Sequence, residues 1–193
     1  MAEVKYLNEW LELAKTGNFE EAQQLYFDKL LPVIADAFSV KYSKLLEEDE
    51  LLISILGFSP EPIILTAKAM KPKNHVIITT GLNQEVENII ESHLDGNFKL
   101  IRLKDEQFIT MYKTLKEQLI LNRYSKVVLD ITGGKKSMVA SASIFGKDYG
   151  CKIVYVDFDE YIKELRKPKP GSEKLNLVYD SRRDQPELNL GNL

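Results

Sequence analysis

The chain has little of three things that would assign it to a specialised class: cysteine, long apolar runs and excess positive charge. Its 193 residues contain one cysteine, Cys151, so no internal disulfide can form, and a small buried apolar side chain is its expected role. The longest apolar stretches, such as Leu51 to Leu56, fall far short of the roughly 20 residues that span a bilayer. The N-terminus does not resemble a signal peptide. We therefore expect a cytoplasmic protein that does not enter a membrane.

The charge balance excludes a second class of function. The sequence has 26 basic and 29 acidic residues, for a formal net charge of −3. Proteins that coat DNA or RNA by bulk electrostatics need a broad basic face. Duplex nucleic acid is therefore not an expected direct partner, and any nucleotide ligand must be bound at a local site.

The usual cofactor motifs are missing as well. A P-loop needs a glycine five residues before its Gly-Lys-Ser or Gly-Lys-Thr, whereas here Gly134 precedes Lys-Lys-Ser and Leu129 stands where the first glycine belongs. No Gly-x-Gly-x-x-Gly fingerprint occurs. His75 begins a predicted strand and His93 lies on an apolar helix face, so neither is expected to be catalytic. The acidic run 157–160 is most simply solvated. We expect no cofactor and no metal.

From residue 51 onward the chain does contain a regular alternation of strand-like and helix-like segments. Such alternation is typical of an α/β fold, a mostly parallel sheet with helices on both faces. The expected strands are 51–56, 75–80, 98–103, 126–131 and 152–157.

A helical hairpin is expected before this sheet. Residues 6–14 and 20–37 predict two helices that turn at Gly17, with Asn18 as N-cap and Glu21 three residues on. Pro32 should kink or interrupt the second helix. One such pair cannot bury its own apolar face, so we expect it to dock on the α/β domain or on a second subunit.

A β-hairpin is expected after the sheet. Residues 161–166 and 174–179 flank the turn-rich segment 168–172, which predicts a hairpin at the edge of the sheet. The polar segment 183–193 is expected to be a flexible tail.

The most distinctive segment is 127–138, Val-Val-Leu-Asp-Ile-Thr-Gly-Gly-Lys-Lys-Ser-Met. It predicts a buried strand that ends in a phosphate-binding turn, because Gly133 and Gly134 let backbone N–H groups approach an anion at the start of the next helix. Lys135 and Lys136 add positive charge. The alternative is an ordinary tight turn followed by solvated lysines.

Two other loops compete for the same edge of the sheet. They are 57–60, Gly-Phe-Ser-Pro, and 79–83, Thr-Thr-Gly-Leu-Asn, and each follows a predicted strand. In open parallel sheets, ligands bind outside the carboxyl ends of the strands, where the strand order reverses.

Residues 130–138 resemble the signature loop of CARF domains, the CRISPR-associated Rossmann-fold sensors of cyclic oligoadenylates, whose usual pattern is Asp-x-Thr-Gly-Gly-x-Lys-x-Met. The likeness extends over about residues 51–180. The family often has Thr where this chain has Lys135. The resemblance implies a Rossmann-like domain over 49–182, with an N-terminal helical appendage at 1–48, and a homodimer that binds the ring across its two-fold axis.

The resemblance also implies a set of ligand-binding residues. They are Gly57, Ser59, Pro60, Thr79, Thr80, Asp130, Thr132, Gly133, Gly134, Lys135, Lys136 and Met138. The glycine amides and Lys136 would hold phosphates, and hydroxyls such as those of Ser59 and Thr80 would bind ribose or adenine. Asp130 would either cap the turn or touch the ligand. Met138 is most simply a core residue.

Three functions are compatible with this resemblance. The first is a sensor module for a cyclic oligoadenylate, with cyclic tetra-adenylate favoured, in type III CRISPR antiviral defence, because no nuclease, deaminase or DNA-recognition motif is visible. It would act through an effector domain or partner protein. The second is a metal-independent ring nuclease in which Lys136, Thr132 and Ser59 position the reacting groups. The third is a transcriptional regulator or adaptor whose residues 1–37 contact a partner.

Overall fold

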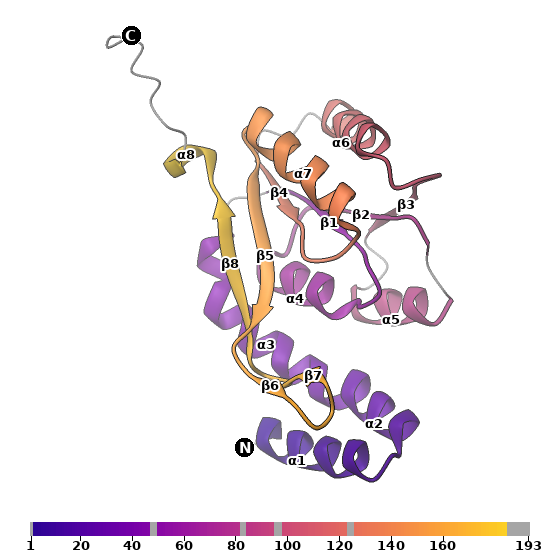
Figure 1. Cartoon of the computed structure of the whole chain (residues 1–193). Coiled ribbons are helices and arrows are strands. Elements are labelled where there is room, and N and C mark those ends of the chain that lie inside the picture. Colours follow the sequence, from indigo (N-terminus) through magenta and orange to yellow (C-terminus); the bar gives the residue numbers. More distant parts are fainter. Residues whose placement is uncertain (1, 47–49, 82–83, 95–97, 123–125, 185–193) are drawn as a thin grey trace.

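The structure is a computed structural model organised around a six-stranded sheet in the order β3-β2-β1-β4-β5-β8 (Figure 1). It describes residues 2–46, 50–81, 84–94, 98–122 and 126–184. The strands are β1 Leu51–Ile55, β2 Asn74–Thr79, β3 Lys99–Arg102, β4 Val127–Asp130, β5 Lys152–Phe158 and β8 Glu173–Tyr179. The first five are parallel, and β8 runs antiparallel to β5. The predicted Rossmann-like α/β fold is confirmed.

Helices cover both faces of this sheet. They are α4 Glu61–Met70, α5 Gln84–Leu94, α6 Phe108–Asn122 and α7 Lys136–Asp148. Because side chains alternate along a strand, Leu52 belongs to the same hydrophobic cluster as Ile64 of α4, while its neighbour Ile53 belongs to the cluster of Phe145 of α7 on the other face. Figure 1 shows α4 and α5 on one side of the sheet and α6 and α7 on the other. None of the helices in the described part of the chain combines the length and apolar character needed to cross a membrane.

The strand order reverses next to the central strand β1. The chain steps from β1 to β2 and β3, and then returns to place β4 on the other side of β1. Ser54 of β1 is paired with Asp130 of β4 at the end of this ladder. The loops after β1 and β4 are therefore neighbours, at the position where open sheets bind ligands. In the loop after β2, Leu82 and Asn83 lie outside the described residues.

The N-terminal region is a chain of short helices: α1 Ala2–Lys15, α2 Phe19–Leu25, the π-helix η1 Tyr26–Leu30, α3 Leu31–Tyr42 and the 3₁₀ turn η2 Ser43–Leu45. The predicted interruption near Pro32 is confirmed. Pro32 lies in the first turn of α3, and since it has no N–H to donate to the preceding turn, that turn widens into η1. Asn18 is the N-cap residue of α2 as predicted, but its side chain makes no capping hydrogen bond.

These N-terminal helices share one hydrophobic core with the sheet. Leu30 and Leu31 are fully buried and belong to the same cluster as Leu52, Leu65 and Val128. The Ser39 hydroxyl also donates to the Lys68 carbonyl oxygen of α4 at 3.0 Å. The expected docking on the α/β domain is confirmed.

The C-terminal hairpin is present but uses different strands from those predicted. Strand β8 pairs with β5 and not with 161–166. This pairing buries Leu175 in the core and satisfies the backbone hydrogen-bonding groups at the edge of β5. The charged segment between them forms only a short ribbon, β6 Tyr161–Ile162 with β7 Lys167–Pro168. The chain then ends its described part in α8 Ser181–Asp184, and most of the predicted tail, from residue 185, lies outside it.

Candidate functional site

The loops after β1 and β4 pack against each other through their backbones. A Cβ atom placed on Gly133 would lie 2.3 Å from the Ile55 carbonyl oxygen and 2.6 Å from the Gly57 nitrogen. A Cβ atom on Gly57 would lie 2.9 Å from the Gly134 nitrogen. Gly134 also has a φ of +83°, a conformation that glycine adopts without strain. The geometry of these loops thus requires glycine at all three positions, whether or not a ligand is present.

This packing leaves a row of amides without protein acceptors at the start of α7. The first capping bonds of the helix run from the Met138 and Val139 amides to the Lys135 carbonyl oxygen, at 2.9 and 3.0 Å. Within the described residues, the amides of Gly133, Gly134 and Lys136 donate to no protein group. Unpaired amides at a helix N-terminus attract anions, so the predicted phosphate-binding geometry is physically available here.

Asp130 and Thr132 tie this loop to its neighbouring strand. Asp130 is 1% exposed, and its Oδ1 accepts hydrogen bonds from the Thr132 amide at 3.0 Å and the Thr132 hydroxyl at 2.5 Å. The Thr132 hydroxyl oxygen accepts from the Val156 amide of β5 at 2.8 Å. Burial raises the pKa of Asp130, and the bonds from Thr132 oppose the rise. Of the two roles left open for Asp130, the structure displays the capping of the turn, and the Thr132 hydroxyl already has two protein partners.

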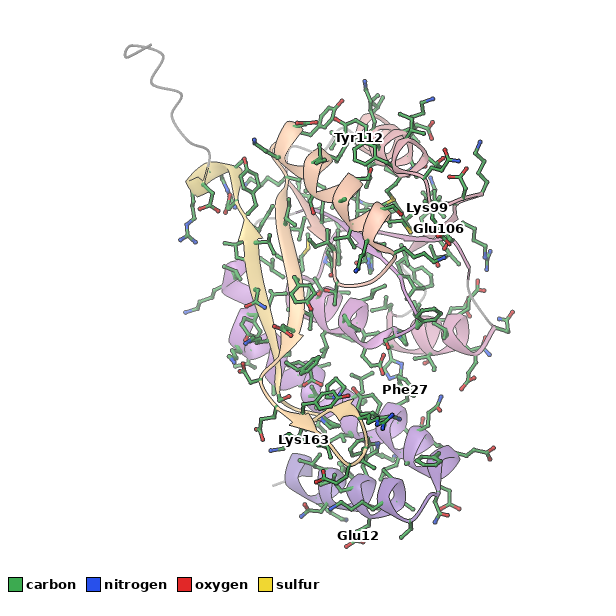
Figure 2. All side chains as sticks on the ribbon, viewed as in Figure 1. Glu12, Phe27, Lys99, Glu106, Tyr112 and Lys163 are labelled. Carbon is green, nitrogen blue, oxygen red and sulfur yellow. The ribbon has the colours of Figure 1, made fainter. Side chains whose placement is uncertain are left out.

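The two lysines of the loop differ in their surroundings. Lys135 forms an ion pair with Glu106, whose backbone carbonyl oxygen also accepts a hydrogen bond from the Ser137 hydroxyl at 2.7 Å. Figure 2 shows Glu106 beside the start of α7. Lys136 is exposed and has no ion-pair partner among the described residues. Of the two, Lys136 is therefore the cation available to an anionic ligand.

The remaining candidate residues divide into surface and interior positions. Ser59 is exposed, and Pro60 is buried at the N-cap of α4. Thr79 is buried, and its hydroxyl donates to the Gly81 carbonyl oxygen at 2.8 Å, while Thr80 is partly exposed. Met138 is 1% exposed within the core beneath Gly134.

A cleft of about 760 Å³ opens beside the glycine loops. Such a volume lies within the range of small-ligand pockets, roughly 300–1,000 Å³. Its walls come from the loop after β1 with the start of α4, the start of α5, the glycine turn, the end of β5, the ribbon at 167–170 and the N-terminal helices. Six of the twelve predicted ligand-binding residues line it: Gly57, Ser59, Pro60, Thr132, Gly133 and Gly134. The other six, Thr79, Thr80, Asp130, Lys135, Lys136 and Met138, are not among its described lining residues. Six segments that are separate in the sequence thus form one concave surface.

Sequence reasoning missed the aromatic side chains around this cleft. Phe58 is 98% exposed within the first loop, and Tyr155 and Phe158 of β5 are 36% and 38% exposed. All three line the cleft. The sequence did contain a signal for Phe58. An aromatic residue between Gly57 and Ser59-Pro60, in a loop that joins a strand to a helix, is expected at the surface and not in the core.

Most of the charged side chains that line the cleft are acidic, namely those of Glu61, Glu85, Asp157 and Glu173. Burial raises the pKa of Glu61, with the positive charge of Lys167 opposing the rise. Burial, followed by the charges of Glu61 and Glu173, also raises the pKa of Tyr26. Lys167 is thus the cation among the described lining residues, and Lys135 and Lys136 lie on the glycine turn outside that lining.

No cluster of three or more metal-binding side chains occurs in the described part of the chain. The acids after β5 are paired with cations. Asp159 accepts from Lys174 at 2.5 Å, and Glu160 accepts from Lys169 at 2.8 Å. His75 is buried against the Ser54 hydroxyl at 3.0 Å, and His93 Nε2 donates to the Phe27 carbonyl oxygen at 3.0 Å, so both histidines have structural partners.

Comparison with known proteins adds relatives of known identity. No protein-family model matches the chain. Over 131 residues, 65% of the chain, it is 26% identical to the CRISPR system endoribonuclease Csm6 of Thermus thermophilus, and this match covers 28% of that protein.

Two solved structures share the fold. Can2 from Sulfobacillus thermosulfidooxidans, solved in complex with cyclic tetra-adenylate, gives a TM-score of 0.52 at 20% identity and covers 60% of this chain and 34% of its own. Csm6 of Enterococcus italicus, bound to cyclic hexa-2′-fluoro-hexa-dAMP, gives a TM-score of 0.51 at 13% identity. The match covers 69% of this chain and 43% of that protein. The chain thus spans between 28% and 43% of the length of these relatives. The comparisons bear out the resemblance to the CARF family.

Proposed function

We propose that this chain is a sensor module that binds a cyclic oligoadenylate, with cyclic tetra-adenylate favoured, between two copies of itself in type III CRISPR antiviral defence. The observation that carries the proposal is the glycine turn at the switch point of the sheet, where the amides of Gly133, Gly134 and Lys136 face no protein acceptor. This turn has the Asp-x-Thr-Gly-Gly-x-Lys-x-Met sequence, and two proteins of the same fold bind such rings.

The roles of the residues follow from their surroundings. The free amides and Lys136 hold phosphates, because an anion there meets the positive end of α7 and an unpaired ammonium group. Ser59, exposed beside the turn, hydrogen-bonds a ribose or a base. Asp130 and Thr132 hold the turn in shape, and Met138 supports it from below.

The dimer follows from the symmetry of the ligand. A ring of four or six identical nucleotides has a two-fold axis, and an isologous pair of subunits offers the same turn to each half of the ring. Binding would then change how the two subunits are arranged. This change would be transmitted to an effector domain or partner protein.

Calorimetric titration with the tetra- and hexa-adenylate rings tests the proposal. We expect saturable binding of at least one ring at micromolar concentrations or below, with the tetra-adenylate ring bound more tightly. Absence of binding by both rings would remove the sensor function. Tighter binding of the hexa-adenylate ring would retain the function and change its ligand.

A second candidate, slow cleavage of the bound ring, is favoured by one observation. The exposed Ser59 and the unpaired Lys136 lie on the two loops that meet at the switch point, where they can orient a ribose 2′-hydroxyl toward the adjacent phosphate. Chromatography of the tetra-adenylate ring after incubation distinguishes the two candidates. Linear di-adenylate indicates a ring nuclease, and an intact ring indicates a sensor.

A further inference from the structure

Phe58 has an unusual position for a large apolar side chain. It is 98% exposed, although it lies between Gly57, whose backbone is packed against the glycine turn, and Pro60, which is buried at the start of α4. The loop therefore holds an aromatic ring in water within one residue of the backbone contact between the two loops. When a flat partner covers an exposed aromatic ring on a well-anchored loop, the complex is stabilised, because apolar surface leaves the water.

The surroundings of Phe58 suit a flat partner. Tyr155 and Phe158, both partly exposed, line the same cleft, and Phe158 stacks on Tyr161 with ring centroids 6.0 Å apart. Aromatic side chains beside a phosphate-binding surface are a common arrangement for nucleotides, because every base has a π-face that can stack. The cleft of about 760 Å³ has room for a base beyond the phosphate-binding turn.

The opposite wall of the cleft belongs to the N-terminal helices. Phe19 of α2 is 63% exposed and faces the cleft with Trp10 of α1 and Tyr26 of η1. Figure 2 shows Phe27 of η1 between these helices and the sheet domain. The docked helices thus give the cleft an apolar far side that the Rossmann-like domain does not supply by itself.

We propose that this cleft is a nucleobase pocket, in which Phe58 stacks on a purine base of a nucleotide whose phosphate lies on the Gly133 and Gly134 amides. The N-terminal helices form its far wall. The inference rests on the proposed function and assigns to the helices a part in ligand binding. A second copy of the chain is the other occupant that could cover Phe58, and the test separates the two.

The test compares Phe58→Ala, Phe58→Leu and Phe58→Tyr with the unaltered chain. Affinity for the tetra-adenylate ring is measured by calorimetry, and oligomeric state by sedimentation. Loss of the aromatic face in Phe58→Ala should weaken binding roughly 5- to 150-fold for each stacked base. Phe58→Tyr should bind as the unaltered chain does, and Phe58→Leu should lose most of the affinity. Val178→Ala, which removes an exposed apolar side chain on β8 outside the cleft, should change nothing.

A second readout is selectivity between bases. The unaltered chain should prefer the adenylate ring over the corresponding uridylate ring, because purines stack more strongly, and Phe58→Ala should narrow this preference. If Phe58 has only a structural role, Phe58→Ala should lower the affinity for both rings by the same factor. That result would overturn the proposal. Conversion of a dimer to a monomer by Phe58→Ala would also overturn it, in favour of a contact with a second copy.

The far wall is tested by fluorescence. Trp10 is the sole tryptophan of the chain and lines the cleft, so ring binding should change its emission. Unchanged emission during saturable binding would show that the base does not reach the N-terminal helices. If the unaltered chain binds no ring in calorimetry, the proposed function and this pocket both fail. If it binds the ring and Phe58→Ala binds equally well, only the pocket fails.

Discussion

The Ile55 carbonyl oxygen lies 2.3 Å from the position that a Cβ atom of Gly133 would occupy. Real Cβ atoms do not come so close to a backbone oxygen, so the end of β1 and the turn after β4 can meet only because residue 133 has no side chain. The same contact sets the direction of the free amides in the turn. Packing of the sheet and binding of an anion therefore depend on one backbone geometry.

Gly133→Ala should destabilise the protein by about 1–3 kcal/mol, since backbone and not a flexible side chain occupies the space that the new methyl group needs. Urea unfolding measures the change. Gly81→Ala is the matched control, because a Cβ atom there meets nothing within 4 Å and φ is not positive. Equal stability of Gly133→Ala and Gly81→Ala would show that the loops do not pack as described.

Lys136→Ala should weaken ring binding by about 1.5–3 kcal/mol, the scale of a hydrogen bond to a charged group. Lys135→Ala should have a smaller effect, because its ammonium group is paired with Glu106. Calorimetry with the tetra-adenylate ring compares the two variants. A larger loss for Lys135→Ala would reverse the roles assigned to the two lysines.

Asp130→Asn should remove a pH dependence of stability. Burial raises the pKa of Asp130 in the folded protein, so its contribution to stability is present below the unfolded value of about 4 and is lost as the pH rises through the folded pKa. The free energy of unfolding of the unaltered chain should therefore fall relative to that of Asp130→Asn as the pH rises above about 4. Urea unfolding at a series of pH values measures both free energies, and a free energy of unfolding of the unaltered chain that rises relative to that of Asp130→Asn above pH about 4 would contradict the assigned direction.

Leu30→Ala should destabilise the whole protein by about 2–5 kcal/mol, because this fully buried side chain belongs to the core shared by the N-terminal helices and the sheet. Val40→Ala, on a side chain that is 84% exposed, should change stability by less than about 0.5 kcal/mol. Thermal unfolding of Leu30→Ala should show one shifted transition. Two separate transitions would mean that the helices fold as an independent unit.

The sheet could be predicted from the sequence because its strands carry their own signal. Residues 51–56 and 126–131 were expected as strands, and β1 and β4 begin and end within one residue of them. Buried parallel strands need short continuous apolar runs, and few other structures do. The turn after β4 was predictable for the same local reason, since Gly133 and Gly134 immediately follow such a run.

Features that depend on distant segments were not predictable in this way. The partner of β8 was misassigned because sequence proximity favoured 161–166, whereas burial of Leu175 decided the pairing. The bond between the Thr132 hydroxyl and the Val156 amide links two strands, and no local pattern marks it. The cleft itself exists because helices before residue 46 dock beside a loop at 57–60, and Phe58 gains its importance only from that arrangement.

Sedimentation equilibrium with and without the tetra-adenylate ring measures whether two chains share one ring. We expect a dimer that carries one ring for every two chains at micromolar concentrations, because each subunit offers one glycine turn to half of a symmetric ligand. A chain that remains monomeric in the presence of the ring, or a complex with one ring on every chain, would contradict it.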